Sequence, residues 1–281
     1  MDFPPNFSEK LNEVGIDPIE IYGKFLPPKY VRPNPRKIDL GILRNLLKEW
    51  GASIEEVTVR PDIIRVTNPG KIPLGETQEF RSGLFYIQDI SSVYPVLSLD
   101  PKPAERILDL CAAPGLKTAL MYDLTEGKAD IIAVEQSLKR KKKLQHLLET
   151  YDISSVHVIH SDGRKFRDQG KFDKVLVDAP CSTEGKIAQI EDSIKTHWTS
   201  WKKIKGLAKL QKGLILKGFR LLKNGGTLVY STCSFPRIEN EDVVSYLQKK
   251  EETAVLEEEK RLNPLDVEGN GGFFAKIKKS F

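Results

Sequence analysis

Apolar and polar residues follow two different patterns along this chain. In the first part, four leucines between positions 40 and 47 fall on one face of a predicted helix over residues 39–50. A further helix is predicted near residues 7–16, a strand at 29–32 and two more strands between residues 51 and 70. This mixture predicts a small α+β module that ends in the loop 70–83, and we place its boundary after residue 82.

The second part, residues 83–281, alternates apolar strands with helices. Strands are predicted at 106–113, 129–136, 155–163, 172–180, 225–235 and 272–280. Helices are predicted at 114–124, 137–152, 193–222 and 238–250. Continuously apolar strands separated by helices are typical of a doubly wound, Rossmann-like α/β sheet. Such a sheet binds ligands at the carboxyl ends of its strands.

Charge adds a candidate partner to this picture. The net charge is +5, but residues 101–230 hold 24 Lys and Arg against 15 Asp and Glu. This local excess favours a polyanion such as RNA, although a solvated lysine-rich surface explains the charge equally well.

Other features indicate the compartment. The N-terminus lacks the apolar region of a secretory signal, and no apolar run has the length of a membrane span. The three cysteines are far apart and show no zinc-ligand spacing, so we expect neither a metal site nor disulfides. We therefore expect a cytoplasmic protein without membrane or DNA partners, and a monomer by default.

A candidate cofactor site follows the first strand of the second part. Gly115 lies in a Pro-Gly turn before a helix, whose free N–H groups favour an anion, but the spacing is neither that of a P-loop nor of GxGxxG. Glu135 follows twenty residues later at the next strand end, where a carboxylate accepts hydrogen bonds from a ribose. Asp162 ends the third strand. With Asp109 at the end of the first strand, Glu135 and Asp162 make three polar strand ends, which predict a nucleoside-containing cofactor. The glycine-poor turn favours S-adenosylmethionine.

Two thiols are predicted at the same edge of the sheet. Asp178 and Cys181 follow the fourth strand, and Cys233 ends the strand at 225–235. Methylation of C5 of a pyrimidine requires a thiolate, because addition to C6 makes C5 nucleophilic. A free thiol has a pKa near 8.5, so the nucleophile needs a cationic neighbour, for which Lys117 is a candidate.

These motifs resemble a known family. The matching stretches are VRPNPRK, GLFYIQDISS, LDLCAAPGLKT, VEQSLKR, DGRKF, VDAPCSTEG, LQKGLILKGFRLLKNGGTLVYSTCS, ENED and GFFAKIKK. In this order they resemble the RsmB/NOP (Sun-domain) family of RNA cytosine-5 methyltransferases, and DAPCS followed by TCS is highly specific for it.

The resemblance implies roles for individual residues. Cys233 is the nucleophile, Cys181 assists breakdown of the covalent adduct, and Asp178 contacts the cytosine edge, with Lys117 as the fourth catalytic candidate. The cofactor residues are Cys111, Ala112, Ala113, Pro114, Gly115, Leu116, Lys117, Glu135, Arg140, Asp162 and Asp178. The small module is expected to bind RNA, with VRPN in place of the usual Arg-x-Asn element.

Two departures from the family pattern and several alternatives remain. Leu116 replaces the second glycine of Gly-Gly-Lys, and Thr183 replaces the glycine of PCSG. We favour tRNA, in an archaeal-type enzyme, over ribosomal RNA. One rival is a DNA cytosine-5 methyltransferase with Cys181 as nucleophile, although no large target-recognition insertion is present. The other is a non-catalytic RNA-binding or assembly protein, which only the two departures support.

Overall fold

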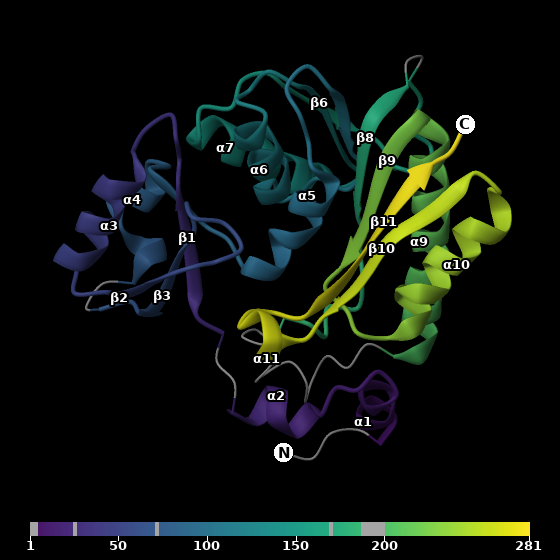
Figure 1. Ribbon diagram of the computed structural model, residues 1–281, viewed down its shortest axis with the longest axis horizontal. Coiled ribbons are helices and arrows are strands. Elements are labelled where there is room, and N and C mark those ends of the chain that lie inside the picture. The colour runs from purple at the N-terminus through teal and green to yellow at the C-terminus, as the bar shows by residue number, and fades with distance from the viewer. Residues whose placement is uncertain (1–4, 25–26, 71–72, 169–170, 187–199) are drawn as a thin grey trace.

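Two β-sheets organise the computed structural model, which describes residues 5–24, 27–70, 73–168, 171–186 and 200–281. A small sheet near the N-terminus lies beside a larger one that carries most of the helices (Figure 1). Among the described residues, no helix is long and apolar enough to cross a membrane.

The large sheet has seven strands in the order β10-β11-β9-β8-β5-β6-β7. Their bounds are β5 Arg106–Asp109, β6 Asp130–Glu135, β7 Val156–His160, β8 Phe172–Asp178, β9 Leu222–Thr232, β10 Ala254–Leu262 and β11 Gly272–Lys279. Strands β5 to β9 pair in parallel, whereas β11 runs antiparallel to both β9 and β10. The parallel strands therefore present their carboxyl ends at one edge.

Helices cover both faces of this sheet (Figure 1). They are α5 Tyr94–Leu99, α6 Leu116–Leu124, α7 Leu138–Thr150, α9 Trp201–Leu221 and α10 Glu241–Lys250. Along β8, Val175 and Val177 join the apolar cluster under α9 and α10, whereas Leu176 joins the cluster under α5 and α6. Strands buried on both faces explain the continuous apolar runs of the sequence.

The small sheet has the order β2-β3-β1-β4 and is antiparallel. Its elements are β1 Lys29–Pro33, α3 Leu40–Glu49, β2 Ser53–Glu56, β3 Ile64–Asn68, α4 Gln78–Arg81 and β4 Phe85–Ile87. Leu43 and Leu47 of α3 are fully buried against this sheet. Strand β4 belongs to the small sheet but lies beyond residue 82. The boundary predicted after residue 82 therefore separates β4 from the other strands of its sheet.

The remaining helices are short. Among the described residues they are α1 Pro5–Asn12, α2 Pro18–Lys24, α11 Pro264–Val267 and the 3₁₀ helices η1 Leu74–Glu76, η2 Ile90–Ser92 and η4 Arg237–Glu239. Figure 1 places α1 and α2 on the same side of the molecule as α11.

The fold class predicted from the sequence is confirmed, but two strands were missed, the short β4 of the small sheet and β10 of the large one. Residues 257–260, Glu-Glu-Glu-Lys, were interpreted as a solvated acidic surface, and they are exposed, yet they belong to β10. As an edge strand, β10 carries charges because they discourage pairing with another chain, and this hides its β pattern. Part of the helix expected from residue 193 lies outside the described residues, and α9 begins at Trp201.

The small sheet is fastened to the large domain through Asp123 of α6. Its two carboxylate oxygens pair with Arg32 and Arg36, and the side chains of Arg32 and Asp123 are 3% and 4% exposed. The Asn34 amide donates to Gly83 O at 2.9 Å and Tyr151 O at 3.2 Å. Arg32 and Asn34, the VRPN residues expected to mark RNA binding, are thus buried between the two parts. RNA binding by the small module stays a prediction, and it would have to involve residues other than these two.

Removing the Asp123 carboxylate should be strongly destabilising. Asp123→Ala leaves the buried Arg32 guanidinium without its partner, which costs about 3–5 kcal/mol of unfolding free energy. Chemical denaturation monitored by circular dichroism measures this loss. Lys128→Ala, which removes an ion pair on the surface, is the control and should leave the midpoint unchanged. A loss in Asp123→Ala no larger than that of the control would contradict the fastening role.

Candidate active site

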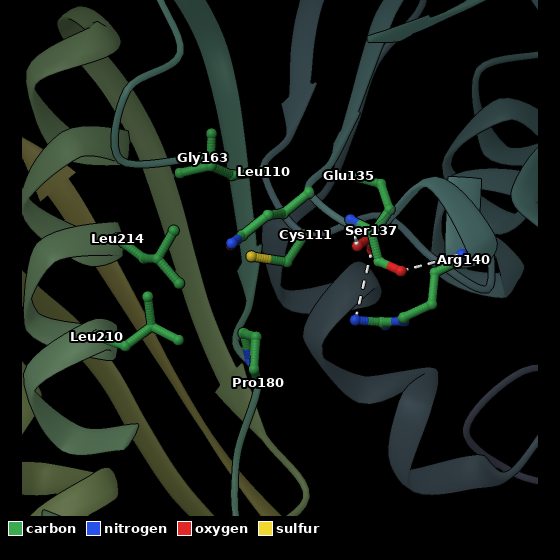
Figure 2. Close-up of a pocket in the computed structure, with 10 residues that line it drawn as sticks. Leu110, Cys111, Glu135, Ser137, Arg140, Gly163, Pro180, Leu210 and Leu214 are labelled. Atoms are coloured by element: carbon green, nitrogen blue, oxygen red, sulfur yellow. Dashed lines mark hydrogen bonds and ion pairs between the residues drawn. The ribbon is translucent and has the colours of Figure 1, made fainter. Parts of the chain in front are cut away.

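The parallel strands of the large sheet end at a pocket of about 340 Å³. Its lining residues are Leu110, Cys111, Glu135, Gln136, Ser137, Arg140, Gly163, Pro180, Leu210 and Leu214. Figure 2 shows Glu135 and Arg140 on one side of it and the two leucines of α9 on the other. Pro180 lines the pocket and directly precedes Cys181, so the pocket adjoins the first of the two predicted thiols.

Glu135 is the buried anion of this pocket. Its Oε1 accepts from the Ser137 N–H at 2.8 Å, and its Oε2 lies 3.4 Å from Arg140 Nη1. That second oxygen is buried and makes no hydrogen bond. A buried carboxylate oxygen without a donor is costly, and a ribose hydroxyl would satisfy it.

The turn before α6 is shaped by Gly115. Its φ is +116°, and a Cβ there would come within 2.7 Å of Leu144, so a larger residue does not fit. Leu116, the first departure from the family pattern, packs with the apolar cluster of α6 and α7 and does not line the pocket. The Leu116 side chain therefore leaves the pocket clear.

The structure brings the two thiols together. Cys181 Sγ and Cys233 Sγ are 3.3 Å apart although the residues are far apart in the chain. Hydrogen bonding from Cys181 lowers the pKa of Cys233 against the effect of burial, and Lys186 and Lys117 lower it further. The same contact, together with burial, raises the pKa of Cys181. Cys233 is therefore the favoured thiolate and Cys181 the donor.

Asp178 and Lys117 form an ion pair at the same edge. Lys117 Nζ donates to Asp178 Oδ2 at 2.7 Å, and Ser231 Oγ donates to Asp178 Oδ1 at 2.8 Å. Burial opposes the charge of Lys117, but Asp178 outweighs it and raises the pKa of the lysine. The Asp178 side chain is 32% exposed, so it remains accessible to a ligand.

Not all predicted cofactor residues reach the pocket. Cys111, Glu135 and Arg140 line it, whereas Ala112, Ala113, Pro114, Lys117 and Asp178 do not. Asp162 is engaged by Arg164 at 2.6 Å, which lowers the pKa of the carboxyl, and its neighbour Gly163 lines the pocket instead. Arg140 donates to the Ala113 carbonyl and thereby ties the turn to the pocket wall.

Sequence reasoning missed the residues that hold the two thiol segments. Asn240 accepts from Thr232 Oγ1 at 2.6 Å and donates to Ser234 O at 3.0 Å, so it braces both neighbours of Cys233. Glu239 binds the segment after Cys181 through Ser182. Both residues belong to the ENED stretch, which is one of the stretches that resemble the family. That match was the feature of the sequence from which their importance could have been inferred.

The segment after Cys181 lies tightly against the last strands. The Gly185 N–H donates to Cys233 O at 3.0 Å, and its carbonyl accepts from the Gly271 N–H at 2.8 Å. A Cβ on Gly185 would come within 2.3 Å of Gly271 O, so this position excludes a side chain.

Thr183, the second departure from the family pattern, has a φ of +70°. A β-branched residue rarely adopts this left-handed conformation, which explains why the family has glycine there.

Comparison with known proteins now settles the family. Residues 96–273 match the family described as 16S rRNA methyltransferase RsmB/F. This chain belongs to that family. The predicted resemblance is thereby confirmed.

Individual relatives agree with this assignment. A ribosomal RNA small subunit methyltransferase F from Shewanella amazonensis is 38% identical over 230 residues, which are 80% of this chain and 49% of the relative. The chain thus spans about half the length of that relative.

Solved structures support the fold. A methyltransferase homolog from Pyrococcus horikoshii is 29% identical with a TM-score of 0.77, covering 98% of this chain and 99% of its own. NSun6 from the same organism, solved with SFG, has a TM-score of 0.84 at 23% identity and covers 97% and 95% of the two chains.

Restoring the family's glycine should stabilise the protein. A left-handed conformation costs an L-residue about 1–2 kcal/mol, and the added freedom of glycine in the unfolded chain offsets part of this. We expect Thr183→Gly to raise the unfolding free energy by about 0.5–1 kcal/mol, measured by urea denaturation. Thr183→Ala keeps Cβ and should gain less. A loss of stability in Thr183→Gly would contradict the assigned strain.

Proposed function

We propose that this protein is an S-adenosylmethionine-dependent RNA (cytosine-5) methyltransferase. The observation that carries the proposal is the contact between Cys181 and Cys233, 3.3 Å apart, beside the Lys117–Asp178 pair and next to the pocket that contains Glu135. Methylation of an amine or a hydroxyl needs no thiol, whereas C5 of cytosine does.

The cofactor fits the residues of the pocket. Glu135 Oε2 is a buried acceptor without a donor, as a ribose-binding carboxylate would be, and Cys111 and the two α9 leucines supply an apolar wall. The cofactor would provide an electrophilic methyl group on sulfur. NSun6, the neighbour in fold, was solved with SFG in its structure.

The residues of this chain divide the reaction between them. The Cys233 thiolate adds to C6 of cytosine, and the electron pair displaced toward C5 takes the methyl group. Asp178 contacts the pyrimidine edge, and the Lys117 ammonium beside it offsets the negative charge that builds up in the ring. A base then takes the C5 proton, whose electron pair re-forms the C5–C6 double bond. The C6–S bond breaks with its electrons on Cys233, which returns as a thiolate, and Cys181 assists this release.

The relatives favour ribosomal RNA as the substrate. The family and its named member are ribosomal RNA methyltransferases, which supports the alternative substrate over tRNA, the one that the sequence analysis preferred. The DNA rival requires Cys181 as the thiolate, whereas the surroundings lower the pKa of Cys233 and raise that of Cys181.

Trapping the covalent adduct tests the division of roles. With RNA that contains 5-azacytidine, the wild-type protein should form an adduct that mass spectrometry locates on Cys233. Cys233→Ala should form none, because it lacks the attacking sulfur. Cys181→Ala should accumulate adduct even with ordinary cytosine, because release is impaired. An adduct that survives Cys233→Ala and disappears in Cys181→Ala would reverse the assignment.

Cofactor affinity tests the pocket. We expect Glu135→Gln to weaken S-adenosylmethionine binding roughly tenfold to hundredfold in calorimetric titration, because hydrogen bonds to a charged group contribute about 1.5–3 kcal/mol. Lys142→Gln on the exposed face of α7 is the control and should bind like the wild type. A wild-type protein that binds no S-adenosylmethionine would instead favour the non-catalytic alternative.

A further inference from the structure

Two buried carboxyl groups lie directly behind the thiol pair. Glu184 is 5% exposed and Glu239 is fully buried. Both contact one hydroxyl group, because Ser182 Oγ lies 2.6 Å from Glu184 Oε2 and also hydrogen-bonds Glu239 Oε2. Ser182 follows Cys181 in the chain, so this cluster holds the segment that carries the donor thiol.

The number of hydrogens in this cluster fixes its charge. A hydroxyl group has one hydrogen and can donate it to only one of the two carboxyl oxygens. If both acids were ionised, the second contact would bring two acceptors together without a hydrogen between them. One of the two acids must therefore carry a proton and donate it to Ser182 Oγ.

The surrounding donors show which acid is protonated. Glu239 accepts from the Ser182 N–H at 3.2 Å, from Gln211 Nε2 at 2.8 Å and from the Ser182 hydroxyl. Glu184 Oε1 is buried and meets no donor with hydrogen-bond geometry. Burial raises the pKa of Glu239 as well, but these three donors oppose the rise. Because one carboxyl oxygen of Glu184 is left without a donor, we infer that the hydrogens run from Glu184 to Ser182 and from Ser182 to Glu239.

We propose that Glu184 is a positioning residue that acts in its protonated form: by donating to Ser182 it holds Cys181 against Cys233. The proposal deepens the proposed function, since it concerns the thiols of that site. Ionisation of Glu184 would place a second negative charge at the same hydroxyl and weaken the hold on Cys181.

Other groups around the cluster agree with this arrangement. Burial raises the pKa of Glu184 to about 7, the charge of Glu239 adds to the rise, and the contacts of the carboxyl group with Ser182 and with the backbone of Glu184 and Phe235 oppose it. The titratable groups beside the two acids are Tyr22 of α2, Tyr230 of β9 and the two cysteines, and Lys186 lies further along the segment. Tyr22 donates to the Glu184 carbonyl at 2.6 Å, so it holds the backbone whatever the charge of the side chain.

The sign of the pH dependence follows from the raised pKa. The folded protein binds this proton more tightly than the unfolded chain, whose glutamate titrates near 4.5. The contribution of Glu184 to stability is therefore complete below about pH 4.5 and is lost as the pH rises to about 7. The glutamine side chain has the same shape as a protonated glutamate, can donate a hydrogen to Ser182 and does not ionise. Glu184→Gln should therefore keep this contribution to stability as the pH rises.

Matched variants test the proposal without RNA or cofactor. The readouts are the rate of Cys233 alkylation by iodoacetamide, followed by mass spectrometry, and the melting temperature from pH 5 to pH 8. Glu184→Ala should slow alkylation at pH 7 about tenfold, because losing the Cys181 contact raises the pKa of Cys233 and leaves less of the reactive thiolate. Glu184→Gln should restore the rate, and its melting temperature relative to the wild type should rise with pH. Glu239→Gln should slow alkylation or fail to fold, because its amide faces donors.

Three results would overturn the proposal. The first is a Glu184→Gln protein that does not fold or whose Cys233 is alkylated as slowly as in Glu184→Ala. The second is a Glu184→Gln protein whose melting temperature changes with pH as that of the wild type does. The third is a Glu239→Gln protein with the alkylation rate and melting temperature of the wild type. Because neither readout involves methyl transfer, these results are independent of whether the protein methylates RNA.

Discussion

The parallel pairing of β8 with β9 is the constraint on which the candidate site depends. In this register Asp178 lies opposite Ser231, whose hydroxyl binds the carboxylate, and the Ala179 N–H donates to Ser231 O at 2.9 Å. The chain leaves both strands at the same edge, so Cys181 and Cys233 meet there. A slip by one residue would turn each side chain of β8 to the other face, so Val175 and Val177 would lose their packing against α9 and α10 and Leu176 its packing against α5 and α6. The core of the sheet therefore fixes the distance between the two sulfurs.

The polar groups around the thiols work in two layers. Lys117 and Asp178 form an ion pair at the carboxyl edge of the sheet, and in the proposed reaction they face the cytosine base. Glu239 and Asn240 lie behind the thiols and hold the backbone on either side, each from the short segment that leads into α10. A buried polar network of this kind gives a unique arrangement only if its members are satisfied. Glu239 and Asn240 thus add to the sheet core in fixing the thiol contact, because they hold the residues next to Cys181 and Cys233.

Much of this architecture was predictable from the sequence, because strand and helix patterns and the ends of parallel strands follow general rules. The sheet edge with Glu135, Asp178 and Cys233 is of this kind. The strand β10 was not predictable, since the charges that protect an edge strand conceal its pattern. The Glu184–Ser182–Glu239 contact was equally hidden, because it joins residues that only the folded chain brings together. The family resemblance identified ENED as a motif but did not indicate which contacts its residues make.

The hydrogen bond from Gly271 to Gly185 has a consequence for how the protein is made. The segment after Cys181 is fixed between Cys233 and the start of β11, and β11 is also the antiparallel neighbour of β9. A nascent chain that has emerged only as far as β9 lacks this clamp and leaves β9 as a bare edge. Both thiols are then synthesised, but the segment after Cys181 is not yet clamped from the side of β11. The hydrogen bond that clamps the segment after Cys181 can therefore form only after the start of β11 has left the ribosome.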